Sequence, residues 1–184
     1  WFGRRTDDTK GLGDYDVNKK KLHKGLEGIS KYANDKKLKF GLWFEPEMVN
    51  EDSSLYETHP DWAIKCEGRI PSKGRHQLVL DLSNKEVQDY IIENVNNTLK
   101  SANIEYVKWD MNRNISDIPN KGDEAGEFYH KYILGLYRVI REITLQNPNV
   151  LFENCASGGN RFDLGMMHYF PQTWASDCSD SYER

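Results

Sequence analysis

The stretch YVKWDMNR, residues 106–113, places a lysine and an aspartate within a short apolar segment. Residues two apart in a strand share a face, so a strand here would turn Lys108 and Asp110 the same way. Val107 and Trp109 would then face the opposite side, where apolar packing is expected. Burying an ammonium and a carboxylate costs several kcal/mol for each charge unless they are paired or used in chemistry. The segment therefore predicts either a structural ion pair or a catalytic site.

A second acidic residue, Asp177, follows another short apolar segment near 173–175. Two carboxylates that face each other across a barrel mouth suit glycoside hydrolysis, in which about 5–5.5 Å separates the carboxyl groups of a retaining enzyme. Capping of a loop or helix is the structural alternative for an aspartate at a strand end. Asp81 fits this alternative better than Asp110 does, because the capping-box pattern of Ser83 and Glu86 follows it directly.

The lysine in the first segment is consistent with more than one role. Lys108 could form a Schiff base with a carbonyl substrate, as aldolase lysines do. Alternatively, its ammonium could keep Asp110 ionised or donate a hydrogen bond to a sugar hydroxyl. A carboxylate two residues away favours the charged ammonium over the neutral amine that a Schiff base needs, so we prefer the second role.

An aromatic side chain and a glycine pair add candidate ligand contacts. Trp43 shares a predicted strand face with Glu45 and is a candidate platform for the apolar face of a sugar, whereas Trp109 and Trp174 are out of phase with the aspartates. The segment NCASGGNR, residues 154–161, lacks the spacing of a phosphate-binding loop. Its glycines, 158 and 159, would let the backbone approach a ligand closely, and a plain strand-to-helix turn is the alternative.

Composition narrows the functional classes. The chain has 25 Lys and Arg against 29 Asp and Glu without a basic stripe, so nucleic acid is not an expected partner. No apolar run is long enough to cross a bilayer, and we expect no membrane partner. The five histidines are scattered, so neither a metal nor a cofactor is expected. The three cysteines contain no C-x-x-C pair, which favours a reducing, cytoplasmic compartment.

Strand-like and helix-like segments alternate along the chain. The apolar patterns predict strands near 40–44, 78–80, 106–110, 150–152 and 173–175, with helices near 19–34, 83–102, 124–146 and 161–168. This order predicts parallel β/α units. Polar residues follow every predicted strand, which favours a (β/α)8 barrel over a doubly wound sheet. About five strands are too few for a closed barrel of eight, so we expect an incomplete barrel.

Several motifs together resemble one enzyme family. KWDMNR at 108–113 is similar to the nucleophile motif of the α-galactosidases of glycoside hydrolase family 36. The other matching motifs, in chain order, are WFGRRTDD at 1–8, LGD at 12–14, GLWFEPEM at 41–48, CASGGNRFD at 155–163 and WASD at 174–177. The resemblance covers essentially the whole chain. It implies that residues 1–184 are part of one catalytic (β/α)8 barrel domain, truncated at both ends.

The same resemblance implies an activity and a set of site residues. Family 36 enzymes remove terminal α-linked galactose from small oligosaccharides such as melibiose, raffinose and stachyose, with retention of configuration. By this resemblance Asp110 is the nucleophile and Asp177 the acid/base, with Asp180 as a rival for the second role. The implied galactose-binding residues are Trp43, Arg75, Lys108, Asn112, Cys155 and Gly158.

Some features depart from the family pattern. The acidic pair that family members carry before the WFG motif lies outside this sequence, and Ala175 stands where threonine is usual. Cys178 and Ser179 replace a more usual polar–threonine pair. The alternatives are an inactive barrel fragment that serves only in folding or assembly, and a Schiff-base aldolase that uses Lys108. Unpaired sheet edges would also favour a homo-oligomer.

Overall fold

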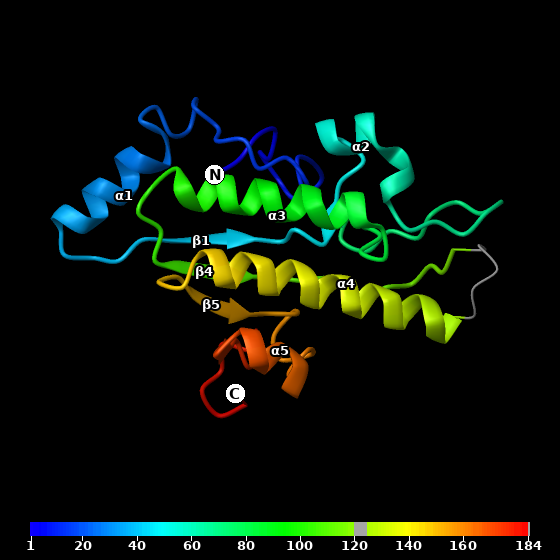
Figure 1. Ribbon diagram of the computed structural model, residues 1–184. Coiled ribbons are helices and arrows are strands. Elements are labelled where there is room, and N and C mark those ends of the chain that lie inside the picture. Colours follow the sequence, from blue (N-terminus) through cyan, green and yellow to red (C-terminus); the bar gives the residue numbers. More distant parts are fainter. Residues whose placement is uncertain (120–124, 184) are drawn as a thin grey trace.

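The computed structural model describes residues 1–119 and 125–183 (Figure 1). In chain order the elements are α1 (Gly25–Asp35), β1 (Gly41–Phe44), β2 (Met48–Val49), α2 (Ser54–Thr58), the 3-10 turn η1 (Pro60–Trp62), β3 (Leu78–Val79), α3 (Lys85–Lys100), β4 (Tyr106–Trp109), α4 (Ala125–Gln146), β5 (Leu151–Asn154), α5 (Leu164–Tyr169) and β6 (Gln172–Thr173). The predicted start of the long helix, at residue 124, lies outside the described residues.

Within the described residues, β1, β4, β5 and β6 form one sheet in that order, and every neighbouring pair is parallel. The long helices α3 and α4 lie side by side across one face of this sheet (Figure 1). The strands point to a common edge, where α2 and the segment 63–80 also lie. Parallel strands joined by covering helices confirm the predicted α/β class, and an incomplete barrel is consistent with it.

Alternation decides which strand residues face the helices. In β1 and β4 the buried positions are Leu42, Phe44, Val107 and Trp109, whereas Lys108 on the opposite face is only partly buried. These buried residues belong to the core that the helices cover. The sequence-based assignment of Lys108 and Trp109 to opposite faces is confirmed, because the strand period of two holds through the whole segment.

The predicted strand at 78–80 does not join the parallel sheet. Leu78 and Val79 instead pair antiparallel with Val49 and Met48, so β2 and β3 form a separate small sheet. The apolar run alone indicated a strand but could not name its partner. Residues 45–80 form an excursion between β1 and α3 rather than the next β/α unit.

Several predicted helix boundaries were also shifted. The helix expected from residue 19 begins at Gly25, and the one expected from 161 begins at Leu164. Asn84, rather than Ser83, caps α3 by accepting the N–H of Glu86 at 2.9 Å. Ser83 donates its hydroxyl to Asp81, which supports the local structural role expected for that aspartate.

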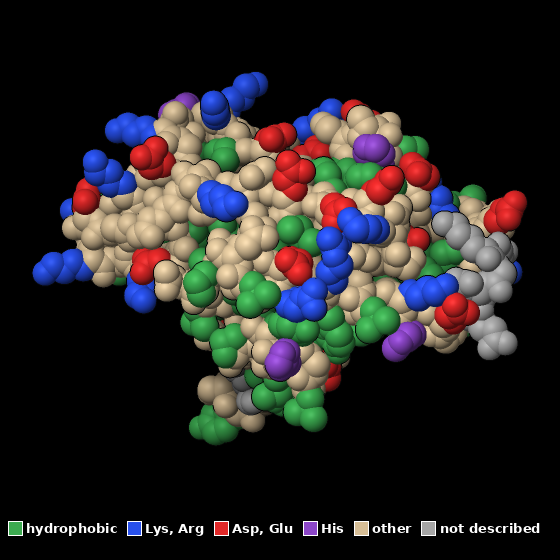
Figure 2. Space-filling model, in the orientation of Figure 1, with side chains coloured by type: hydrophobic (Ala, Val, Ile, Leu, Met, Phe, Trp, Pro, Cys, Tyr) green, Lys and Arg blue, Asp and Glu red, His purple; other side chains and the backbone are tan. Residues whose placement is uncertain are grey.

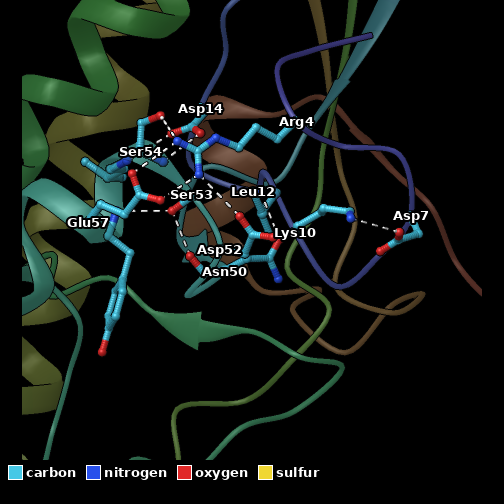
Figure 3. Close-up of polar contacts among 12 residues, drawn as sticks. Arg4, Asp7, Lys10, Leu12, Asp14, Asn50, Asp52, Ser53, Ser54 and Glu57 are labelled. Atoms are coloured by element: carbon cyan, nitrogen blue, oxygen red, sulfur yellow. Dashed lines mark hydrogen bonds and ion pairs between the residues drawn. The ribbon is translucent and has the colours of Figure 1, made fainter.

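The N-terminal segment is fastened to the excursion by polar contacts (Figure 3). The Asp14 carboxylate accepts the backbone N–H groups of Ser54 and Leu55 at 2.8 and 3.0 Å, which satisfies donors at the start of α2. Arg4 reaches Glu57 at 2.6 Å on the same helix. Residues far apart in the sequence are thereby held together beside the carboxyl end of β1.

In the described parts of the chain, no helix combines the length and the apolar character that crossing a membrane requires.

Candidate active site

Asp110 follows β4 directly, and its carboxylate is held in place. The residue is 7% exposed, and its backbone N–H donates to the Phe44 carbonyl at 2.8 Å. Its Oδ2 accepts hydrogen bonds from the Trp43 indole at 2.9 Å and from the Asn112 side-chain amide at 2.7 Å. Donors from both β1 and the loop after β4 therefore orient this carboxylate.

The indole of Trp43 acts here as a hydrogen-bond donor. Its ring also lies parallel to Phe2, with centroids 6.3 Å apart, and the Arg5 guanidinium lies 5.6 Å from its centroid. The Trp1 indole donates to the Trp43 carbonyl at 2.9 Å. These contacts use part of the Trp43 surface, and its role as a sugar platform stays a prediction.

Lys108 lies on the same face as Trp43, its partner in the parallel register. The Lys108 ammonium lies 4.6 Å from the centroid of the Trp174 ring, a cation–π contact. The Trp174 indole in turn donates to Asp177 Oδ1 at 3.0 Å. The expectation that Trp174 is out of phase with Asp177 was wrong, because β6 ends at Thr173 and the alternation does not extend to residue 177.

Cys155 follows β5 and contacts the end of β4 and the loop after it. Its backbone N–H donates to the Trp109 carbonyl at 2.8 Å, and its own carbonyl accepts from Met111 at 3.0 Å. Burial raises the pKa of the Cys155 thiol to about 11, and a hydrogen bond to the Asp110 carboxylate and its charge act in the same direction. The thiol therefore lies beside Asp110.

The loop after Cys155 continues toward Asp177. Gly158 has a φ of +87°, and a Cβ there would lie 3.3 Å from the backbone nitrogen of Asp177. The Gly159 N–H donates to the Ala175 carbonyl at 3.0 Å. Glycine is favoured at 158 because this backbone conformation is strained for other residues and a Cβ would make a tight contact with the Asp177 backbone. The loop after Cys155 therefore contacts both segments that carry the predicted acids, and Asp177 is exposed.

Arg75 lies at the exposed tip of a tight turn in the excursion. Arg75 and His76 have φ values of +53° and +62°, and Gly74 and Gln77 exchange backbone hydrogen bonds across them. Residues other than glycine seldom adopt this conformation, and such strain is frequent at ligand sites. Arg113 donates to the Gln77 carbonyl at 2.8 Å, which joins this turn to the loop after Asp110.

Glu45 belongs to this site, although the sequence-based set did not include it. It is 1% exposed, and burial together with the charge of Asp110 raises its pKa to about 7. Its carboxylate accepts the Asn112 backbone N–H at 2.7 Å and the Gln77 side-chain amide at 2.9 Å. The signal was its position two residues after Trp43, which puts both on one face of the strand end.

A buried ion pair lies behind the site. Glu47, 0% exposed, accepts hydrogen bonds from the Trp109 indole, the Tyr132 hydroxyl and the Arg161 guanidinium at 2.8–3.0 Å. These partners come from β4, α4 and the loop before α5. The sequence alone gave no sign of this cluster, because its members are spread over more than a hundred residues.

An open pocket lies next to the loop that follows Asp110. Its volume is about 600 Å³, and it lies between the loops 111–115 and 156–161, with Tyr129 of α4 at its side. Asn112 and Ser157 line it, and the Ser157 hydroxyl donates to the Asn112 side chain at 3.2 Å. The pocket gives a small polar molecule room beside Asn112.

The fold consists of parallel β/α units, and the strand ends carry an oriented carboxylate, a lysine and a second acid. This arrangement is typical of the active sites of (β/α)8-barrel enzymes. Comparison with known sequences makes the assignment specific: the melibiase family model matches residues 1–184, and the chain belongs to the melibiase family. α-Galactosidase AgaA of Geobacillus stearothermophilus is 52% identical over 187 residues, covering 100% of this chain and 26% of that protein.

Solved structures agree with this assignment. The AgaA crystal structure superposes with a TM-score of 0.93 and 53% identity, covering 98% of this chain and 26% of that chain. The α-galactosidase of Lactobacillus brevis gives a TM-score of 0.95 at 49% identity, covering 100% and 25%. AgaA variants have been crystallised with raffinose and with stachyose. The present chain therefore spans about a quarter of the length of these relatives.

Proposed function

We propose that this chain supplies the part of a catalytic (β/α)8 barrel that carries both acids of a retaining α-galactosidase. The observation that carries the proposal is the Asp110 carboxylate, buried at a strand end and oriented by Trp43 and Asn112. Cys155 and Gly158 connect this carboxylate to the segment that bears Asp177. The substrate class follows from relatives that were crystallised with raffinose and stachyose.

The proposed reaction is a double displacement. Asp110 attacks the anomeric carbon while Asp177 gives its proton to the departing glycosidic oxygen, which leaves a galactosyl ester on Asp110. The ionised Asp177 then takes a proton from water as the water oxygen attacks the same carbon. The ester bond breaks, galactose leaves, and both acids return to their starting states.

The surrounding residues have proposed roles in this cycle. The Trp43 and Asn112 donors hold the attacking carboxylate, as their hydrogen bonds to Oδ2 indicate. Lys108, Arg75, Cys155 and the backbone at Gly158 would bind galactose hydroxyls. The Lys108 ammonium already makes a cation–π contact with the Trp174 ring, which does not favour a Schiff-base aldolase.

The test is hydrolysis of 4-nitrophenyl α-galactoside by the complete protein that carries this chain. We expect Asp110→Asn to lower kcat at least about a thousandfold and to leave substrate binding largely intact. Asp35→Asn, at the exposed end of α1, is the matched control and should behave like the native protein. Nuclear magnetic resonance should show α-galactose as the first product. Appreciable turnover by the Asp110 variant, or β-galactose as first product, would contradict the proposal.

The same assay on the 184-residue chain by itself decides whether the segment is sufficient. Barrel closure brings strand ends together, so we expect the complete protein to be active and the isolated chain to be much weaker.

A further inference from the structure

A chain of hydrogen bonds runs behind Asp110 from the excursion to the site. The Gln77 side-chain amide donates to Glu45 Oε2 at 2.9 Å, and the Asn112 backbone N–H donates to Glu45 Oε1 at 2.7 Å. The Asn112 side chain then donates to Asp110 Oδ2 at 2.7 Å. Glu45 and Gln77 are 1% and 2% exposed, so solvent does not replace either contact.

The groups that face Glu45 come from several segments. Asp110 acts on it from the end of β4, and the buried phenol of Tyr15 from the N-terminal segment. Arg113 contacts Gln77 from the loop after Asp110, through the backbone carbonyl. Glu47, two residues along, is engaged by Arg161. Burial and the negative charge of Asp110 together raise the pKa of Glu45 to about 7, where it can gain a proton under ordinary conditions.

We propose that Glu45 is a positioning residue. Its carboxylate, held by Gln77, fixes Asn112, and Asn112 in turn fixes the attacking carboxylate of Asp110. A proton bound by Glu45 weakens this support. The inference rests on the proposed role of Asp110 and adds to it a residue that controls the orientation of Asp110. Both oxygens of Glu45 accept an N–H in the structure, which is the arrangement of the ionised form.

Gln77 offers an alternative arrangement for the protonated form. Its side-chain Oε1 is buried without a hydrogen-bond partner among the described residues. If the amide turns over, this oxygen can accept the O–H of a protonated Glu45. A glutamine at position 45 would present its NH2 in the same way, so Glu45→Gln mimics the protonated state with nearly unchanged shape.

The charge of Glu45 is also coupled to the reaction cycle. Formation of the galactosyl ester removes the negative charge of Asp110, and with it one of the causes that raise the pKa of Glu45. Glu45 then favours its ionised form, in which Asn112 is held most firmly. We therefore expect the hydrogen bond between Glu45 and Asn112 to be strongest in the galactosyl-ester intermediate, before water attacks.

The first arm of the test does not need catalysis. The backbone amide proton of Asn112, which Glu45 accepts, is followed by nuclear magnetic resonance in the 184-residue chain from pH 5 to 9. We expect its resonance to shift with a midpoint near pH 7, to stay flat around this pH in Glu45→Gln, and to shift at lower pH in Asp110→Asn. The exposed control Glu93→Gln should titrate like the native chain. An Asn112 resonance that titrates identically in native and Glu45→Gln chains would overturn the proposal.

The second arm measures the pH dependence of kcat in the complete protein. The native enzyme should lose activity as pH falls through about 7. Glu45→Gln should lack this inflection and have a kcat about tenfold lower at pH 8, with little change in KM. An unchanged inflection in this variant would reject the positioning role. If the native protein hydrolyses no α-galactoside, the proposed function fails, and the resonance arm still decides whether Glu45 supports Asn112.

Discussion

Asp110 receives its supporting hydrogen bonds from side chains on either side of it in space. The Trp43 indole and the Asn112 amide reach the same oxygen, whereas the Met111 N–H contacts the other at 3.0 Å. At the scale of the residue, a buried carboxylate in this setting is oriented before any substrate arrives. Such preorganisation is what an attacking group needs, because no energy is then spent on turning it.

Replacing Trp43 with phenylalanine separates its possible roles. Phenylalanine keeps an aromatic face but loses the N–H that donates to Asp110. If the donor role dominates, kcat/KM should fall about 10- to 100-fold. Steady-state kinetics on the complete protein measures this change. Nearly unchanged kinetics would indicate instead that the ring face is what matters.

The stability of the fold should also depend on the charge of Glu45. The ordinary pKa of this group is 4.5, and the folded state raises it to about 7. Between these values the unfolded chain loses the proton while the folded chain keeps it, so the contribution of Glu45 to stability is fully present below pH 4.5 and is lost as pH rises through about 7.

We expect this group to lower the free energy of unfolding by about 3 kcal/mol across that window. The measurement is urea unfolding of the native chain and of Glu45→Gln at several pH values. The difference between the two should change with pH in this window. A constant difference would show that Glu45 does not titrate as inferred.

At the scale of the element, helix ends show how the sequence fits its local geometry. Helix α1 ends in a turn where Leu38 donates to the Ala33 carbonyl and Lys37 donates to the Asn34 carbonyl, at 3.0 and 2.8 Å. This is the Schellman arrangement, in which glycine is the usual residue after the cap. Lys37 has a φ of +61°, so a side chain is present where glycine would fit without strain.

Lys37→Gly should therefore stabilise the protein by up to about 1 kcal/mol. Lys36, at a φ of −91°, provides the matched control because glycine there only adds freedom to the unfolded chain. Thermal and urea unfolding should show opposite signs for the two changes. Equal destabilisation by both would contradict the assignment of strain to position 37.

At the scale of the whole molecule, distant segments meet in the buried cluster around Glu47. Arg161, from the loop before α5, pairs with this glutamate at 2.8 Å, while Trp109 and Tyr132 complete its contacts. The cluster joins the excursion (residues 45–80), β4, α4 and the loop 155–161 that contains Gly158 and Gly159. It therefore fixes both loops that line the pocket beside Asn112.

Arg161→Met should destabilise the fold by about 3–5 kcal/mol, because it leaves the Glu47 carboxylate buried and unpaired. Urea unfolding measures this change. Lys85→Met, which breaks an exposed pair with Asp89, is the control and should have a much smaller effect. Similar effects of the two substitutions would mean that the buried cluster does not hold the loops together.

The molecule also presents apolar surface around α5. Figure 2 shows hydrophobic side chains gathered over this part of the molecule. Phe162, Leu164 and Met167 are 63%, 85% and 45% exposed, and β6 beside them forms an edge of the described sheet. This surface is consistent with the expected incomplete barrel, and the homo-oligomer stays a prediction.

The sequence by itself determined three things. These are the succession of parallel β/α units along the chain, the alternation that puts Lys108 and Trp109 on opposite strand faces, and the family. These depend on local periodicity and on motifs that lie within a few neighbouring residues. Only the tertiary structure decided that residues 78–79 leave the parallel sheet and that Trp174 contacts Asp177. It also decided that Glu45 and Glu47 are buried with partners from other segments. The physical reason is that strand partners, buried charges and hydrogen-bond chains depend on contacts between distant residues, which local patterns do not encode.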